Sequence, residues 1–103
     1  SWSAVCDEAY KENLVECDYA AYLAMIDALP VYEFNFISDD EDVDRKYRGP
    51  MAQDWHRLIP TRDRNMKDKL SIDTLDADGC VLAAIKGLAL SFSELESKFD
   101  LTA

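Results

Sequence analysis

The sequence predicts an α+β domain in which helices support a small antiparallel sheet and protruding hairpin or loop arms. Three patterns lead to this prediction. Apolar residues recur at helical spacing before Pro30, an aromatic segment after it alternates with period two, and a heptad pattern runs through the C-terminal end. The chain has 103 residues, a length that fits one domain.

Composition restricts the function classes. The chain holds 21 Asp and Glu against 11 Lys and Arg, a formal net charge of −10. This acidity argues against nucleic acid as a partner and against docking on anionic lipid. No 18-residue apolar run is present, so we expect no membrane partner either. Three widely spaced cysteines, an odd number, favour a reducing compartment: Cys6, Cys17 and Cys80.

Two aspartates can begin helices in the first third of the chain. Asp7 can cap a short helix running through Lys11 and Leu14, and Asp18 can cap a second one. Pro30 ends this second helix. Its apolar stripe predicts core packing and consists of Tyr19, Tyr22, Leu23, Ile26 and Leu29.

The middle of the chain predicts a hairpin and a short helix. Residues 31–37 alternate as a strand, and residues 47–51 can return beside it. The acidic run at 38–44 and the bases that follow it suit a solvated, protruding loop, and residues 61–69 form a second candidate protrusion. Residues 52–59 read as a helix that carries Trp55 and His56 and ends at Pro60.

The last third predicts a short strand at 71–75, a turn or helix start at 76–79, and a C-terminal helix with a heptad seam. Two bulky Phe residues fit a three-helix seam, or packing under the same domain, better than a narrow dimer. The seam consists of Val81, Ile85, Leu88, Phe92, Leu95 and Phe99.

We expect no metal and no cofactor. A calcium loop around Gly79 would place Thr74 and Ile85 at its first and twelfth positions, where carboxylates are needed. A zinc site built on His56 would lack the close cysteine pair that structural zinc sites usually have.

One segment combines a thiol with an amine. A lysine can activate a neighbouring nucleophile when burial lowers its pKa, which makes Cys6 and Lys11 candidates. Five residues on an ideal helix correspond to about 140° around its axis, so the two would not face each other. Either the chain bends at Asp7, or the lysine comes from a neighbouring chain.

Three blocks together resemble a phage family. Residues 6–14 are similar to its Ser-Asp-x-x-x-Lys-x-x-Ile/Leu opening, residues 49–60 to its Gly-x-x-Ala-Gln block with a following Pro, and residues 71–88 to its strand-then-helix ending. The family is the auto-processing intramolecular chaperone domain at the C-termini of phage tail spikes, tail fibres, neck appendages and endosialidases.

The resemblance implies a homotrimer whose arms clasp the upstream stalk of the same polypeptide. It also implies self-cleavage just before the family's serine, here the Val5–Cys6 bond. The family's nucleophile and assisting lysine match Cys6 and Lys11, with Asp7 as a capping or orienting residue. The candidates for trimer packing come from the heptad spacing and are Ile85, Leu88, Phe92, Leu95 and Phe99.

The chain opens on Ser1 without an initiator Met, and we expect it to be part of a longer polypeptide. Residues 1–5 would end the stalk and residues 6–103 would form the chaperone. Because Cys6 replaces the family's serine, we expect this form to be uncleaved or slow. The domain would act in the host cytoplasm during virion assembly and leave the mature tail. The alternative is a non-catalytic trimeric structural or adaptor module.

Overall fold

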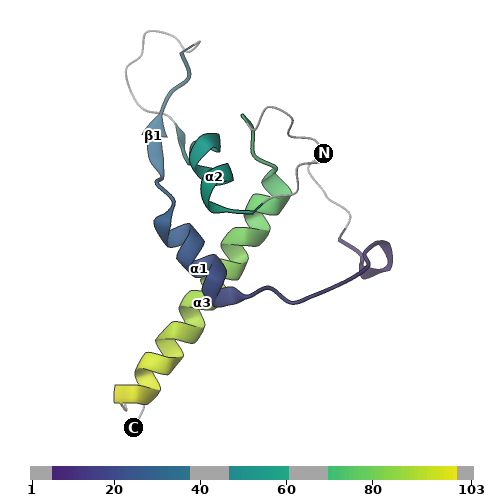
Figure 1. Cartoon of the computed structure of the whole chain (residues 1–103), viewed down its shortest axis with the longest axis vertical. Coiled ribbons are helices and arrows are strands. Elements are labelled where there is room, and N and C mark those ends of the chain that lie inside the picture. Colours follow the sequence, from purple (N-terminus) through teal and green to yellow (C-terminus); the bar gives the residue numbers. More distant parts are fainter. Residues whose placement is uncertain (1–5, 38–46, 61–69, 100–103) are drawn as a thin grey trace.

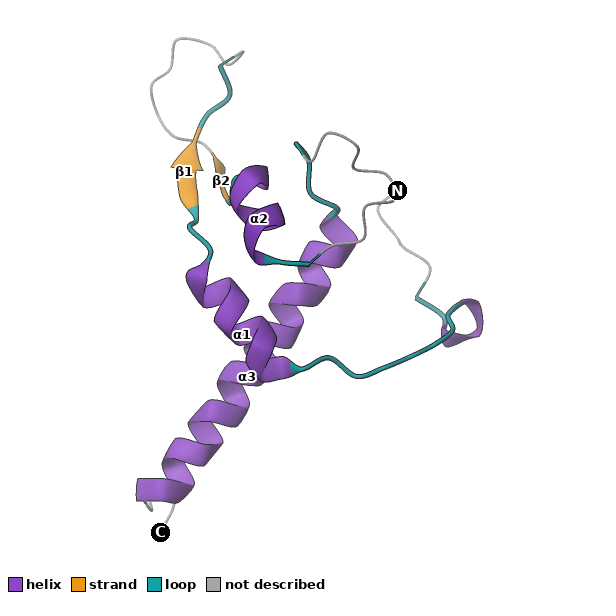
Figure 2. Cartoon of the chain, in the orientation of Figure 1, coloured by secondary structure: helices purple, strands orange, loops and turns teal. Residues whose placement is uncertain are grey.

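The computed structural model describes residues 6–37, 47–60 and 70–99, and these form an α+β fold as predicted (Figure 1). The elements in chain order are the 3₁₀ turn η1 (Glu8–Tyr10), α1 (Tyr19–Ala28), β1 (Tyr32–Phe34), β2 (Tyr47–Gly49), α2 (Ala52–Leu58) and α3 (Thr74–Phe99). The two strands pair antiparallel. Figure 2 shows α1 crossing the long helix α3. Helix α2 and the hairpin lie on the side of this crossing where the N-terminal half of α3 is found.

Helix α1 begins and ends where the sequence predicts. The Asp18 carboxylate accepts a hydrogen bond from the backbone N–H of Ala21 at 3.2 Å, which satisfies one of the donors exposed at a helix start. At the other end, the N–H of Leu29 donates to the carbonyl of Ile26 at 3.1 Å. Pro30 follows and cannot continue the helix.

The most extensive contact among the described elements joins α1 to α3. A side chain at Gly87 would prevent it, since a Cβ there would lie 2.9 Å from the carbonyl carbon of Tyr19 and 3.0 Å from the Cβ of Leu23. The buried face of α3 consists of small residues: Cys80, Ala83, Ala84 and Gly87. Small side chains thus let the two backbones approach closely.

The core lies where α2 meets the two crossed helices. Trp55 of α2 and Ile59, the residue that follows α2, are 2% and 1% exposed, and Cys80 of α3 completes the buried cluster. The partly buried apolar residues around it are Tyr22, Met25, Ile26, Leu29, Leu58, Ile72 and Ala77. The apolar stripe of α1 therefore contributes to the core, as predicted, through three of its members.

The hairpin is shorter than predicted. Among the described residues, Tyr32–Phe34 and Tyr47–Gly49 are the ones that pair, with Phe34 opposite Tyr47 and Glu33 opposite Arg48. Aromatic side chains pack together at the end of the hairpin where the chain leaves β1 and returns to β2, because the ring centroids of Phe34, Phe36 and Tyr47 lie between 5.1 and 5.9 Å apart.

The strand predicted at residues 71–75 is wrong, and the helix begins earlier than the turn predicted at 76–79. Asp73 starts α3: its carboxylate accepts from the N–H of Leu75 at 3.0 Å, and its carbonyl accepts from the N–H of Ala77 at 2.9 Å. Gly79 lies inside α3, where a Cβ would meet no atom within 4 Å. Glycine is tolerated there at a modest cost in helix propensity.

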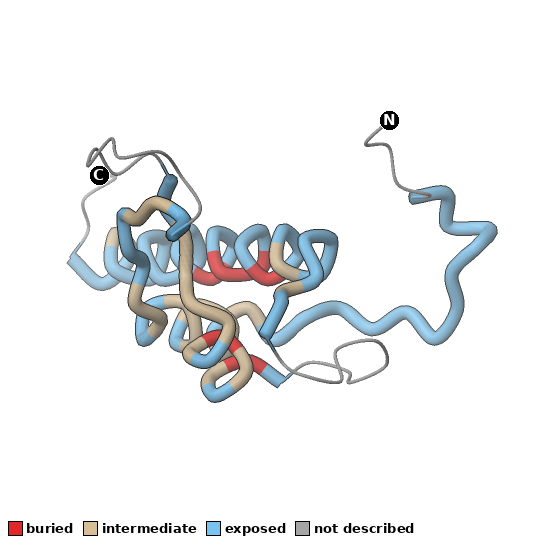
Figure 3. The backbone as a smooth tube through the Cα atoms, turned by 90° about the horizontal axis from the view of Figure 1, so that it is seen from above, coloured by how far each residue is buried: buried red, intermediate tan, exposed pale blue. Residues whose placement is uncertain are grey.

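The N-terminal segment has the predicted cap and lacks the predicted helix. The Asp7 carboxylate accepts from the N–H of Ala9 at 3.0 Å, but the single turn ends at Tyr10 and does not continue to Leu14. Every residue from 6 to 18 is exposed, as Figure 3 shows. The predicted stalk end at 1–5 and the protrusions predicted at 38–44 and 61–69 lie outside the described residues.

We expect Gly87→Ala to lower the free energy of unfolding by about 1–3 kcal/mol, because a methyl group would force α1 away from α3. Gly79→Ala is the matched control on the same helix. It should raise stability by up to about 1 kcal/mol, since it improves helix propensity without a clash. Denaturant titrations at one protein concentration compare the two. Equal effects of both substitutions would contradict the close approach at Gly87.

Candidate functional site

The predicted nucleophile and lysine flank one turn of 3₁₀ helix. Asp7 is extended (φ −66°, ψ 127°), so the chain bends between Cys6 and η1. Lys11 is extended as well (φ −121°, ψ 151°), and its N–H donates to the carbonyl of Glu8 at 3.0 Å. On a regular helix Cys6 and Lys11 would lie about 140° apart around the axis. The extended backbone at Asp7 breaks the helix between them, so this separation does not apply.

The single chain nevertheless does not assemble these groups into a site. Cys6 and Lys11 are both exposed, and within the described ranges neither side chain has a hydrogen-bond or ionic partner. Amine bases in proteins owe their activity to burial, which lowers the pKa of the ammonium. Any chemistry at this segment therefore requires a surface that covers it.

The other two cysteines differ sharply in environment. Cys17 is exposed, whereas Cys80 is 5% exposed within the core. Burial raises the pKa of the Cys80 thiol to about 11, and the carboxylate of Asp76 one turn earlier adds to the rise. Cys80 is thus a protonated core residue at neutral pH and an unsuitable nucleophile.

The histidine considered for zinc has a structural contact. His56 Nε2 lies 2.8 Å from the carbonyl oxygen of Ser71 and can donate to it, which ties α2 to the segment that enters α3. Within the three described ranges, no three His, Cys, Asp or Glu side chains come together as metal ligands would.

The residues predicted to form a heptad seam lie on α3, and the described part of the chain does not bury them. Its six members are between 44% and 64% exposed. The face of α3 that contacts α1 is centred about 110° around the helix axis from the seam. The seam was predicted from the sequence, but this second face was not. The pattern that could have predicted the second face is the helical spacing of small residues from Cys80 to Gly87.

A second cluster that sequence reasoning missed anchors the start of α1. The Tyr19 hydroxyl donates to the Glu16 carboxylate, and the Lys86 ammonium lies 5.4 Å from the centre of the Tyr19 ring. The hydrogen bond to Glu16 is the main reason that the pKa of Tyr19 is raised. These contacts join the end of the exposed segment to α3.

Comparison with known proteins identifies the class. The family described as chaperone of endosialidase matches residues 6–64, more than half of the chain. The chain belongs to this family, that of C-terminal intramolecular chaperone domains, and has a chaperone role. Neither the curated proteins nor the solved structures gave a match. No helix in the described residues has the length and apolar character of a membrane span.

We expect Cys80 to resist thiol reagents in the folded protein. A rise of its pKa from 9.0 to about 11 lowers the thiolate fraction near pH 8 roughly a hundredfold. A variant that keeps only Cys80 (Cys6→Ala, Cys17→Ala) should react with a chromogenic disulfide only after denaturant is added. The matched variant that keeps only Cys17 should react at once. Equal rates for the two folded variants would contradict the burial of Cys80.

Proposed function

We propose that this domain is a trimerising folding chaperone for the elongated stalk of a phage tail fibre or spike, and that self-cleavage at Val5–Cys6 is its route of release, slow or blocked in this form because Cys6 replaces the serine of the family pattern. The exposed seam on α3 carries the proposal, together with the family match. The partners are two further copies of the chain and the upstream stalk of the same polypeptide. The site of action would be the host cytoplasm during virion assembly.

The case for association rests on apolar surface that one chain cannot cover. All buried residues of α3 lie between Cys80 and Gly87, and the C-terminal half of the helix projects beyond α1 (Figure 1). That half still carries Phe92, Leu95 and Phe99. Burying one large apolar side chain contributes about 1.5–3 kcal/mol. Phe92 and Phe99 are bulky, and a seam that contains them fits a bundle of three such helices better than a narrow dimer.

Trimerisation explains how the domain could help a stalk to fold. Three elongated chains must begin to pair in register, and non-local pairing is slow because loop-closure entropy is lost before contacts form. A trimer at the C-terminal end holds the three chain ends together, so that registration becomes nearly intramolecular.

Release requires a nucleophile beside the bond it cleaves. The Cys6 sulfur would attack the Val5 carbonyl carbon, forming a C–S bond as the Val5–Cys6 C–N bond breaks. The Lys11 amine would take the thiol proton and pass it to the departing amine of Cys6. Water would then hydrolyse the thioester, freeing the Val5 carboxylate and restoring the thiol. The start of the family match at Cys6, and the name of the family, a peptidase family, support this step.

We expect the chain to sediment as a trimer at micromolar concentration and Phe92→Asp to convert it to a monomer, because three buried carboxylates would repel one another. Leu82→Asp is the control. Leu82 is 64% exposed on α3, about 100° around the axis from the seam centre, so its substitution should leave the trimer intact. A monomeric parent chain would refute trimerisation.

We expect Cys6→Ser to restore the residue of the family pattern and to release the peptide 1–5 over hours, as detected by mass spectrometry. Adding Lys11→Ala should abolish release, because the proton acceptor is lost. Adding Lys98→Ala, a change of an exposed lysine at the far end of α3, should not. An intact Cys6→Ser trimer would overturn release by self-cleavage and favour the alternative, a non-catalytic trimeric module.

A further inference from the structure

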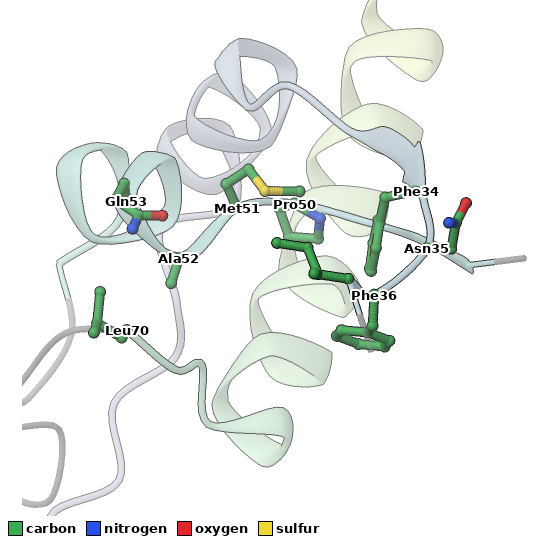
Figure 4. A pocket seen from close by; sticks show the side chains of 9 residues that line it. Phe34, Asn35, Phe36, Pro50, Met51, Ala52, Gln53 and Leu70 are labelled. Atoms are coloured by element: carbon green, nitrogen blue, oxygen red, sulfur yellow. The ribbon is translucent and has the colours of Figure 1, made fainter. Parts of the chain in front are cut away.

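We draw no further inference here: the strongest candidate, the apolar pocket of about 800 Å³ between the hairpin and α2 that Phe34, Phe36 and Leu70 help to line (Figure 4), carries none, because nothing in the described part of the chain shows what covers it.

Discussion

The structure depends on the close approach of α1 to α3 at Gly87. Because no side chain stands between this position and the backbone of Tyr19, α1 can cross the face of α3 on which only small residues are buried. The crossing brings Tyr22 and Ile26 toward Cys80, and α2 closes the cluster with Trp55 and Ile59. One backbone contact thus determines where the small core can form.

Among the described residues, this arrangement buries one face of α3 and leaves the residues of the predicted seam exposed, together with Leu14 and Val15 between η1 and α1. A small domain buries too little of its surface to be highly stable alone, so association would complete the fold as well as align the stalk. Cys6 and Lys11 are exposed in the same way: the described residues provide the bend at Asp7 and leave the amine of Lys11 in contact with solvent.

The parts of the fold that local chemistry specifies could be predicted from the sequence. Asp7 and Asp18 cap their helices as expected, since a carboxylate one residue before a turn satisfies its free N–H groups. The reading of residues 71–75 as a strand was wrong because alternation over five residues is too weak a signal, and the capping residue Asp73 lies within it. The strands were overestimated in length, since only three residues of each find partners.

The sequence by itself determined the family, the α+β class and the two aspartate caps, because residue type and local spacing specify each of them. Only the tertiary structure decided which face of α3 is buried, since apolar periodicity favoured the seam whereas small residues allow the closer contact with α1. It also separated Cys80, held protonated by burial, from exposed Cys6 and Cys17. Burial depends on contacts between segments distant in sequence, which no local pattern specifies.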